Sequence, residues 1–151
     1  MRIIIYILII ALSLPTTLLA ADPIIGTWKE KSVDDPKIKE AFLIYSEIED
    51  GMIEFSTRDV LKDGTTDSSK WVFPKEGGIL KRLSSKIEEE LMYVGIFPEP
   101  NHLIISITKN GRQVAMYNKI ISKDGNTLTQ TLTVIEKDGK PMNVKKVFEK
   151  Q

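Results

Sequence analysis

Residues 110–140 read NGRQVAMYNKIISKDGNTLTQTLTVIEKDGK and contain three tight-turn signals at an even spacing. Gly111 and Gly125 are 14 residues apart, and so are Gly125 and Gly139. Asn-Gly and Asp-Gly pairs favour two-residue hairpin turns because these residue types tolerate positive φ angles. Each interval holds one strand of about ten residues plus one turn, so the stretch predicts a meander of neighbouring strands.

The residues between two of these turns alternate as a half-buried strand requires. Leu128, Leu132 and Val134 share one face with Gln130, while the opposite face consists of threonines. Successive strand residues point to opposite sides of a sheet, so a period of two indicates one apolar face and one solvated face. A polar residue therefore stands on an otherwise apolar face at Gln130, and Lys146 stands in the same way between Val144 and Phe148.

Similar turn signals occur earlier in the chain, at Asp50-Gly51, Asp63-Gly64 and Gly77-Gly78. Runs rich in β-branched and aromatic residues lie between the turns and are predicted to be strands. With the strand around Gln130, they span residues 24–31, 41–49, 52–60, 68–73, 78–84, 89–97, 102–109, 112–122 and 141–149.

One segment favours a helix. Ser32 or Asp34 can cap free amide groups, Pro36 suits a first helical turn, and residues 37–40 continue for about one turn.

The connections between the predicted strands are short, so the sheet has to hide its two edge strands by closing on itself or by folding into two faces. The predicted fold is therefore all-β: an antiparallel meander barrel of eight to ten strands with one short N-terminal helical turn.

The first twenty residues have the pattern of a secretory signal peptide. Met1-Arg2 supplies a positive start, residues 3–12 are apolar, and Pro15 precedes the small residues Ala20 and Ala21. The apolar run is shorter than the about 20 residues that a membrane-spanning helix needs. We expect cleavage after Ala20 or Ala21, a single barrel domain over 22–151, no membrane span afterwards, and a periplasmic or extracellular destination.

Composition argues against several classes of function. The 151 residues include no cysteine, which excludes disulfides and thiolate metal sites, and the formal net charge is zero. A balanced surface offers no electrostatic footprint for nucleic acid. His102, the one histidine, is predicted to be a solvated loop residue, and Glu88-Glu89-Glu90 a charged strand edge. No enzyme, metal or cofactor motif is present.

The segment IIGTWKEK resembles the start of the first strand in lipocalins, whose signature Gly-x-Trp falls on Gly26 and Trp28. Residues 120–150, IISKDGNTLTQTLTVIEKDGKPMNVKKVFEK, look like the end of small secreted bacterial lipocalin-like proteins, a largely uncharacterised family. The resemblance implies that Gly26 and Trp28 close one end of the barrel, with Lys145 or Lys146 as a cation over the indole.

The last strand is also similar to that of intracellular fatty-acid-binding proteins, which end in Arg-x-Tyr and hold a fatty-acid carboxylate with both residues. The matching positions are Lys146 and Phe148. An ammonium lacks the planar fork of a guanidinium, and phenylalanine lacks the hydroxyl, so the clamp itself is not carried over.

These observations favour an exported binding protein for a small apolar or amphipathic ligand held inside the barrel. The alternative is a filled barrel that acts as a structural or protein-interaction module of the cell envelope, with an unknown partner. A cavity of ~300 Å³ or more would favour the ligand. The predicted ligand contacts are Met116, Leu128, Gln130, Leu132, Lys146 and Phe148.

Overall fold

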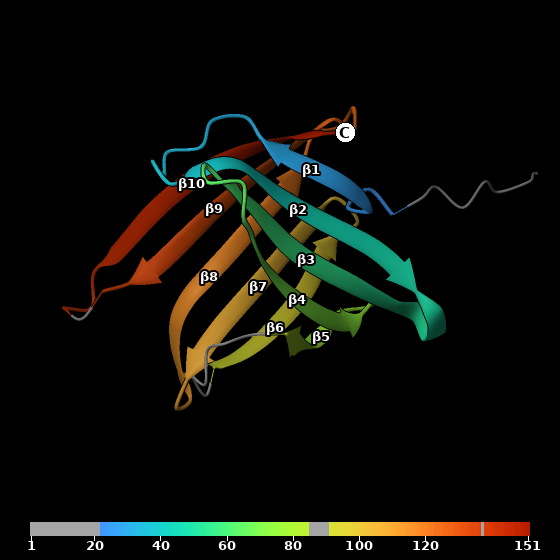
Figure 1. Cartoon of the computed structure of the whole chain (residues 1–151). Coiled ribbons are helices and arrows are strands. Elements are labelled where there is room, and N and C mark those ends of the chain that lie inside the picture. The colour runs from blue at the N-terminus through green and yellow to red at the C-terminus, as the bar shows by residue number, and fades with distance from the viewer. Residues whose placement is uncertain (1–21, 85–90, 137) are drawn as a thin grey trace, which may run out of the picture.

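The computed structural model describes residues 22–84, 91–136 and 138–151, which form one closed antiparallel barrel (Figure 1). Its ten strands are β1 (Gly26–Glu30), β2 (Ile38–Ile48), β3 (Met52–Leu61), β4 (Thr66–Pro74), β5 (Gly78–Ser84), β6 (Leu91–Glu99), β7 (His102–Lys109), β8 (Arg112–Ile121), β9 (Thr127–Ile135) and β10 (Pro141–Lys150). The predicted all-β class, an antiparallel meander barrel of eight to ten strands, is confirmed.

Each strand pairs with its neighbours in sequence, and β1 closes the barrel by pairing with both β2 and β10. Trp28 lies opposite Leu43 on one side and Lys150 on the other. The first and last strands lie side by side in Figure 1. The meander predicted from the spacing of the turns is therefore the observed topology.

The turn chemistry explains why the strands stop where they do. Asn110 and Gly111 have φ angles of 50° and 73° and connect Lys109 to Arg112, which pair directly. Two consecutive positive φ angles define the hairpin turn whose twist matches that of the flanking strands. Asp50 and Gly51 also have positive φ angles, within the short 3-10 turn η1 (Glu49–Gly51).

The predicted helical turn at 37–40 is wrong, because β2 already begins at Ile38. The Asp35 side chain accepts a hydrogen bond from the Lys37 amide at 2.8 Å, and the Asp35 carbonyl accepts one from the Ile38 amide at 3.1 Å. Pro36 thus occupies the second position of a tight turn. Proline suits that position as well as a first helical turn, since both need a φ near −65°.

Trp28 is fully buried. Its Nε1 donates a hydrogen bond to the Ile24 carbonyl at 2.8 Å, and the Lys150 ammonium lies 5.1 Å from the ring centroid. The expected cation, Lys145 or Lys146, is therefore wrong: the register places Lys150 opposite Trp28. Gly26 has a φ of 137°, and a Cβ there would lie 2.8 Å from Lys150 Cε.

Two sequence predictions lie outside the described residues: the signal peptide at 1–20 and the acidic run Glu88-Glu89-Glu90. Within the part of the chain that the structure describes, no helix has the length and apolar character needed to cross a bilayer.

Candidate ligand-binding interior

Three aromatic side chains on neighbouring strands form a stack along one interior wall. Tyr45, Phe55 and Trp71 come from β2, β3 and β4 and lie directly opposite one another in the strand register. The ring centroids of Tyr45 and Phe55 are 4.6 Å apart, and those of Phe55 and Trp71 are 5.2 Å apart. Paired positions face the same side of a sheet, so the register alone brings the rings together. Tyr93 on β6 extends the stack with a tilted ring.

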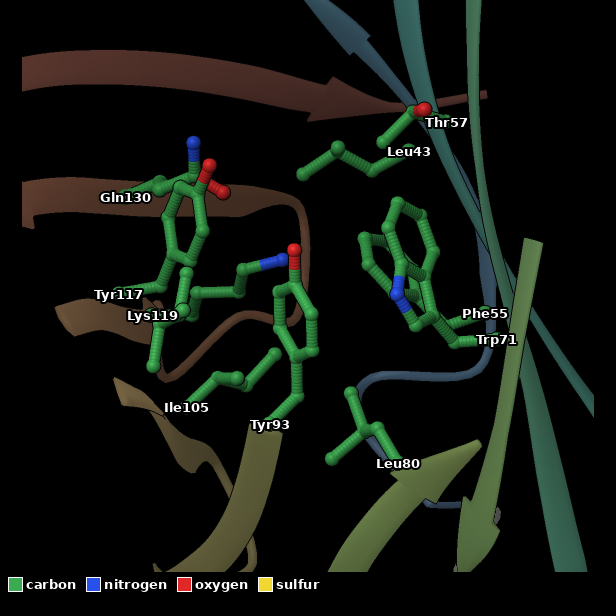
Figure 2. Close-up of a pocket in the computed structure, with 11 residues that line it drawn as sticks. Leu43, Phe55, Thr57, Trp71, Leu80, Tyr93, Ile105, Tyr117, Lys119 and Gln130 are labelled. Carbon is green, nitrogen blue, oxygen red and sulfur yellow. The ribbon is translucent and has the colours of Figure 1, made fainter. Parts of the chain in front are cut away.

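Lys119 reaches this wall from β8 and is almost completely buried, at 2% exposure. Its ammonium donates a hydrogen bond to the Tyr45 hydroxyl at 2.5 Å and lies 4.2 Å from the Phe55 ring centroid. The same ammonium lies 5.5 Å from the centroid of the Tyr117 ring. Figure 2 shows the Lys119 side chain extending from the β8 side of the cavity toward Phe55 and Trp71.

Burial changes the acid–base behaviour of this cluster. It lowers the pKa of Lys119 to about 7, because the charged form loses its hydration inside the barrel. Burial also raises the pKa of Tyr45 well above 10, so the hydroxyl keeps its proton at neutral pH. The interior therefore holds a lysine that is about half neutral at pH 7 next to a protonated phenol.

An inner cavity of about 130 Å³ opens beside Lys119. Its walls are mainly aromatic and aliphatic, with Lys119 and Gln130 among the few polar groups; the other lining residues are Leu43, Phe55, Thr57, Trp71, Leu80, Tyr93, Ile105, Ile107 and Tyr117. Gln130 Oε1 and Trp71 Nε1 are buried and have no hydrogen-bond partner among the described residues. Apolar walls with a few polar groups are the composition of a small-molecule site.

An outer cavity of about 220 Å³ lies against the inner one and is more polar. Glu30 on β1 has a side chain only 2% exposed, and its carboxylate accepts a hydrogen bond from Lys146 on β10 at 2.9 Å. Asp59 on β3 also lines this cavity, and burial raises its pKa although Lys146 acts in the opposite direction. Lys146 thus forms an ion pair with Glu30, and its charge also acts on Asp59.

The two cavities share Leu43, Thr57, Tyr117 and Gln130 in their walls. Neither cavity alone reaches the ~300 Å³ typical of a pocket for a drug-sized molecule. A ligand of that size has to occupy both, with one end near Lys119 and the other near Glu30 and Lys146.

The structure brings four of the six predicted contacts to these cavities. Gln130 lines both, and Leu132, Lys146 and Phe148 line the outer one. Leu128 is fully buried in the core near Phe148 and lines neither. Met116 alternates with Tyr117 and Lys119 along β8, so it lies on the opposite face of that strand and borders neither cavity.

Lys119 and the aromatic stack are the functional candidates that the sequence reasoning missed. The signal for Lys119 was present: in the run YNKII, Tyr117, Lys119 and Ile121 share one face, the same pattern that singled out Gln130 and Lys146. The stack has no such local signal, because it depends on the register between β2, β3 and β4.

His102 is not a loop residue as predicted, because it begins β7, and its side chain is half-buried. Its Nε2 lies 2.7 Å from Asn118 Oδ1 on β8, a hydrogen bond between neighbouring strands. Among the residues that the structure covers, no group of three or more His, Asp or Glu side chains is placed to hold a metal ion.

Comparison with solved structures supports the architecture. The barrel is similar to the wild-type fluorescent protein UnaG, with a TM-score of 0.58 at 14% identity over 85% of this chain and 97% of that one. A mutant of UnaG gives a TM-score of 0.59 at the same identity, over 85% and 96% of the two chains. No family model and no curated protein matches the sequence. At this identity the likeness establishes the fold alone, a closed antiparallel β-barrel.

Proposed function

We propose that the protein is an exported, non-enzymatic carrier or sensor of a small apolar or amphipathic molecule held inside the barrel. The observation that carries this proposal is the pair of adjoining cavities, lined by stacked aromatic rings and by polar groups at both ends. A filled barrel would have packed this space with side chains, since protein interiors are as dense as organic crystals.

The arrangement of polar groups favours an amphipathic ligand over a purely apolar one. Gln130 Oε1 and one oxygen of Glu30 are buried without a hydrogen-bond partner among the described residues, and both residues line the outer cavity. A buried acceptor that finds no donor costs about 1–3 kcal/mol, so a ligand that donates hydrogen bonds there gains affinity.

A cavity-filling substitution tests the proposal. Thr57 lines both cavities, so Thr57→Phe places a ring where they meet. Ser56→Phe is the matched control, because the neighbouring strand residue points to the other face. We expect the wild type and Ser56→Phe to bind the probe anilinonaphthalene sulfonate in a saturable way, and Thr57→Phe to bind it about tenfold more weakly or worse.

Near-ultraviolet circular dichroism of all three proteins checks that the barrel stays folded. Probe binding that is equal in the two variants would place the probe outside the barrel and refute the interior site. Independently of the probe, mass spectrometry of small molecules that co-purify with the protein would identify the natural ligand class.

Export is supported by the signal-like pattern at the N-terminus and has its own test. N-terminal sequencing of the protein recovered from its host should give a chain that begins at Ala21 or Asp22. Recovery of a chain that still carries residues 1–20 would contradict this part of the proposal.

A further inference from the structure

Lys119 combines burial with the lack of a carboxylate to neutralise it. In residues 22–84, 91–136 and 138–151, no salt bridge involves Lys119, and no other lysine is buried. Desolvation alone lowers its pKa to about 7. A buried lysine without a counter-ion is costly to keep charged, which is how proteins make the amine a nucleophile.

The surroundings of the amine also suit a covalent reaction. Lys119 lines the inner cavity, so an occupant of that cavity lies against its side chain. The Tyr45 hydroxyl, 2.5 Å from Nζ, stays protonated at neutral pH because burial raises its pKa, and it can pass a proton to a reacting oxygen. The stacked rings of Phe55 and Trp71 offer a flat surface for a conjugated ligand.

We propose that Lys119 is a covalent attachment site for a small unsaturated aldehyde, which enters the inner cavity and forms an imine with Nζ. This inference rests on the proposed ligand-binding function and specifies the chemical class of the ligand. An aldehyde longer than the inner cavity extends past Thr57 and Gln130 into the outer one, because both residues line both spaces.

The reaction needs no oxidant, reductant or further co-reactant. The lone pair of the neutral Lys119 amine forms a bond to the carbonyl carbon, and the electrons of the C=O π bond move to oxygen. A proton passes from nitrogen to that oxygen, with the Tyr45 hydroxyl as the nearest relay, and gives a carbinolamine. Loss of water then breaks the C–O bond and forms the C=N bond, so the net change is amine plus aldehyde to imine plus water.

Only the neutral amine reacts, which separates Lys119 from ordinary lysines at neutral pH. With a pKa of about 7, close to half of Lys119 is neutral at pH 7. A lysine with the usual pKa of about 10.4 is neutral in roughly one molecule in 2,500 at that pH. Partly exposed Lys146 is further engaged by the Glu30 carboxylate.

Reductive trapping tests the site with a defined probe. The full chain is incubated near pH 7 with a sub-stoichiometric amount of para-dimethylaminocinnamaldehyde, reduced with sodium cyanoborohydride, and analysed by intact mass and peptide mapping. We expect a single adduct on Lys119, about tenfold or more above any other lysine. Lys119→Met should lose this adduct, whereas Lys145→Met, which removes an exposed lysine of β10, should keep it.

Anilinonaphthalene sulfonate binding to the same samples separates two kinds of failure. Saturable probe binding without a Lys119 adduct would overturn the aldehyde inference and leave the ligand-binding proposal standing. Loss of both would overturn the proposed function as well. Label spread evenly over lysines, and unchanged in Lys119→Met, would show surface reaction only and would also refute the inference.

Discussion

Replacing Lys119 with methionine should remove a pH dependence from the stability of the barrel. In the folded protein the pKa of Lys119 is lowered to about 7, whereas in the unfolded chain it has the ordinary value of about 10.4. Between these two values the unfolded chain binds more protons than the folded protein, so the free energy of unfolding must rise with pH. The destabilisation that Lys119 causes is greatest below about pH 7, and it disappears as the pH approaches the pKa of about 10.4 that the residue has in the unfolded chain.

The size of the effect follows from the two pKa values. Each unit of pH between them is worth about 1.4 kcal/mol, and at the folded pKa the slope has half that value. From about pH 7 to about pH 9 the wild-type free energy of unfolding should therefore rise by about 2 kcal/mol because of this group. Lys119→Met, which keeps the length and apolar stem of the side chain, should show no such rise.

The interval from pH 7 to pH 9 isolates Lys119 from the tyrosines beside it. Tyr45 and Tyr117 both have pKa values raised above 10 by burial, so neither ionises in this range. Asp59, whose pKa is also raised by burial, is present in both the wild type and Lys119→Met, so its titration is common to the two proteins. The rise can therefore be assigned to one side chain.

Urea denaturation at pH 7, 8 and 9, followed by tryptophan fluorescence, measures the effect, since Trp28 and Trp71 are both buried. Lys145→Met serves as the exposed control and should keep the wild-type rise. Equal pH dependence in the wild type and Lys119→Met would refute the claim that a desolvated amine sits in the barrel. The aldehyde inference would lose its chemical basis as well.

Three further substitutions test the barrel around the site. Trp28→Ala should lower the free energy of unfolding by about 3–5 kcal/mol in urea titrations, because it empties a fully buried ring position. Lys146→Met should cost up to about 3 kcal/mol by leaving the buried Glu30 carboxylate unpaired, and adding Glu30→Gln should recover most of that loss in the same titration. Gly26→Ala should lower the thermal midpoint, with a cost of ~1–3 kcal/mol from the positive φ angle. Because that cost comes from the backbone, removing the contacting side chain with Lys150→Ala should not restore the midpoint.

The sequence predicted the local features of this fold well, for a physical reason. Turns such as Asn110-Gly111 are specified by two adjacent residues, so their positions and the strands between them can be inferred without knowing the rest of the molecule. Strand parity likewise placed Gln130 and Lys146 inside the barrel. Strand parity along β8 points Lys119 into the barrel in the same way.

The features that could not be predicted depend on residues far apart in the chain. Glu30 and Lys146 are 116 positions apart, and they meet because β1 pairs with β10. That register also places Lys150, rather than Lys145 or Lys146, over Trp28. Pro36 was ambiguous for another reason: a tight turn and a first helical turn require the same φ angle, and only the long pairing of β2 with β3 selects the turn.

The pairing of β1 with β10 has a consequence for when the protein can fold during its synthesis. Until the ribosome has made residues 141–150, β1 has a partner on one side only, and β9 presents an unpaired row of amides and carbonyls. Unpaired strand edges invite association with other chains. The sheet therefore has no unpaired strand edge only after β10 has been made and has paired with β1 and β9.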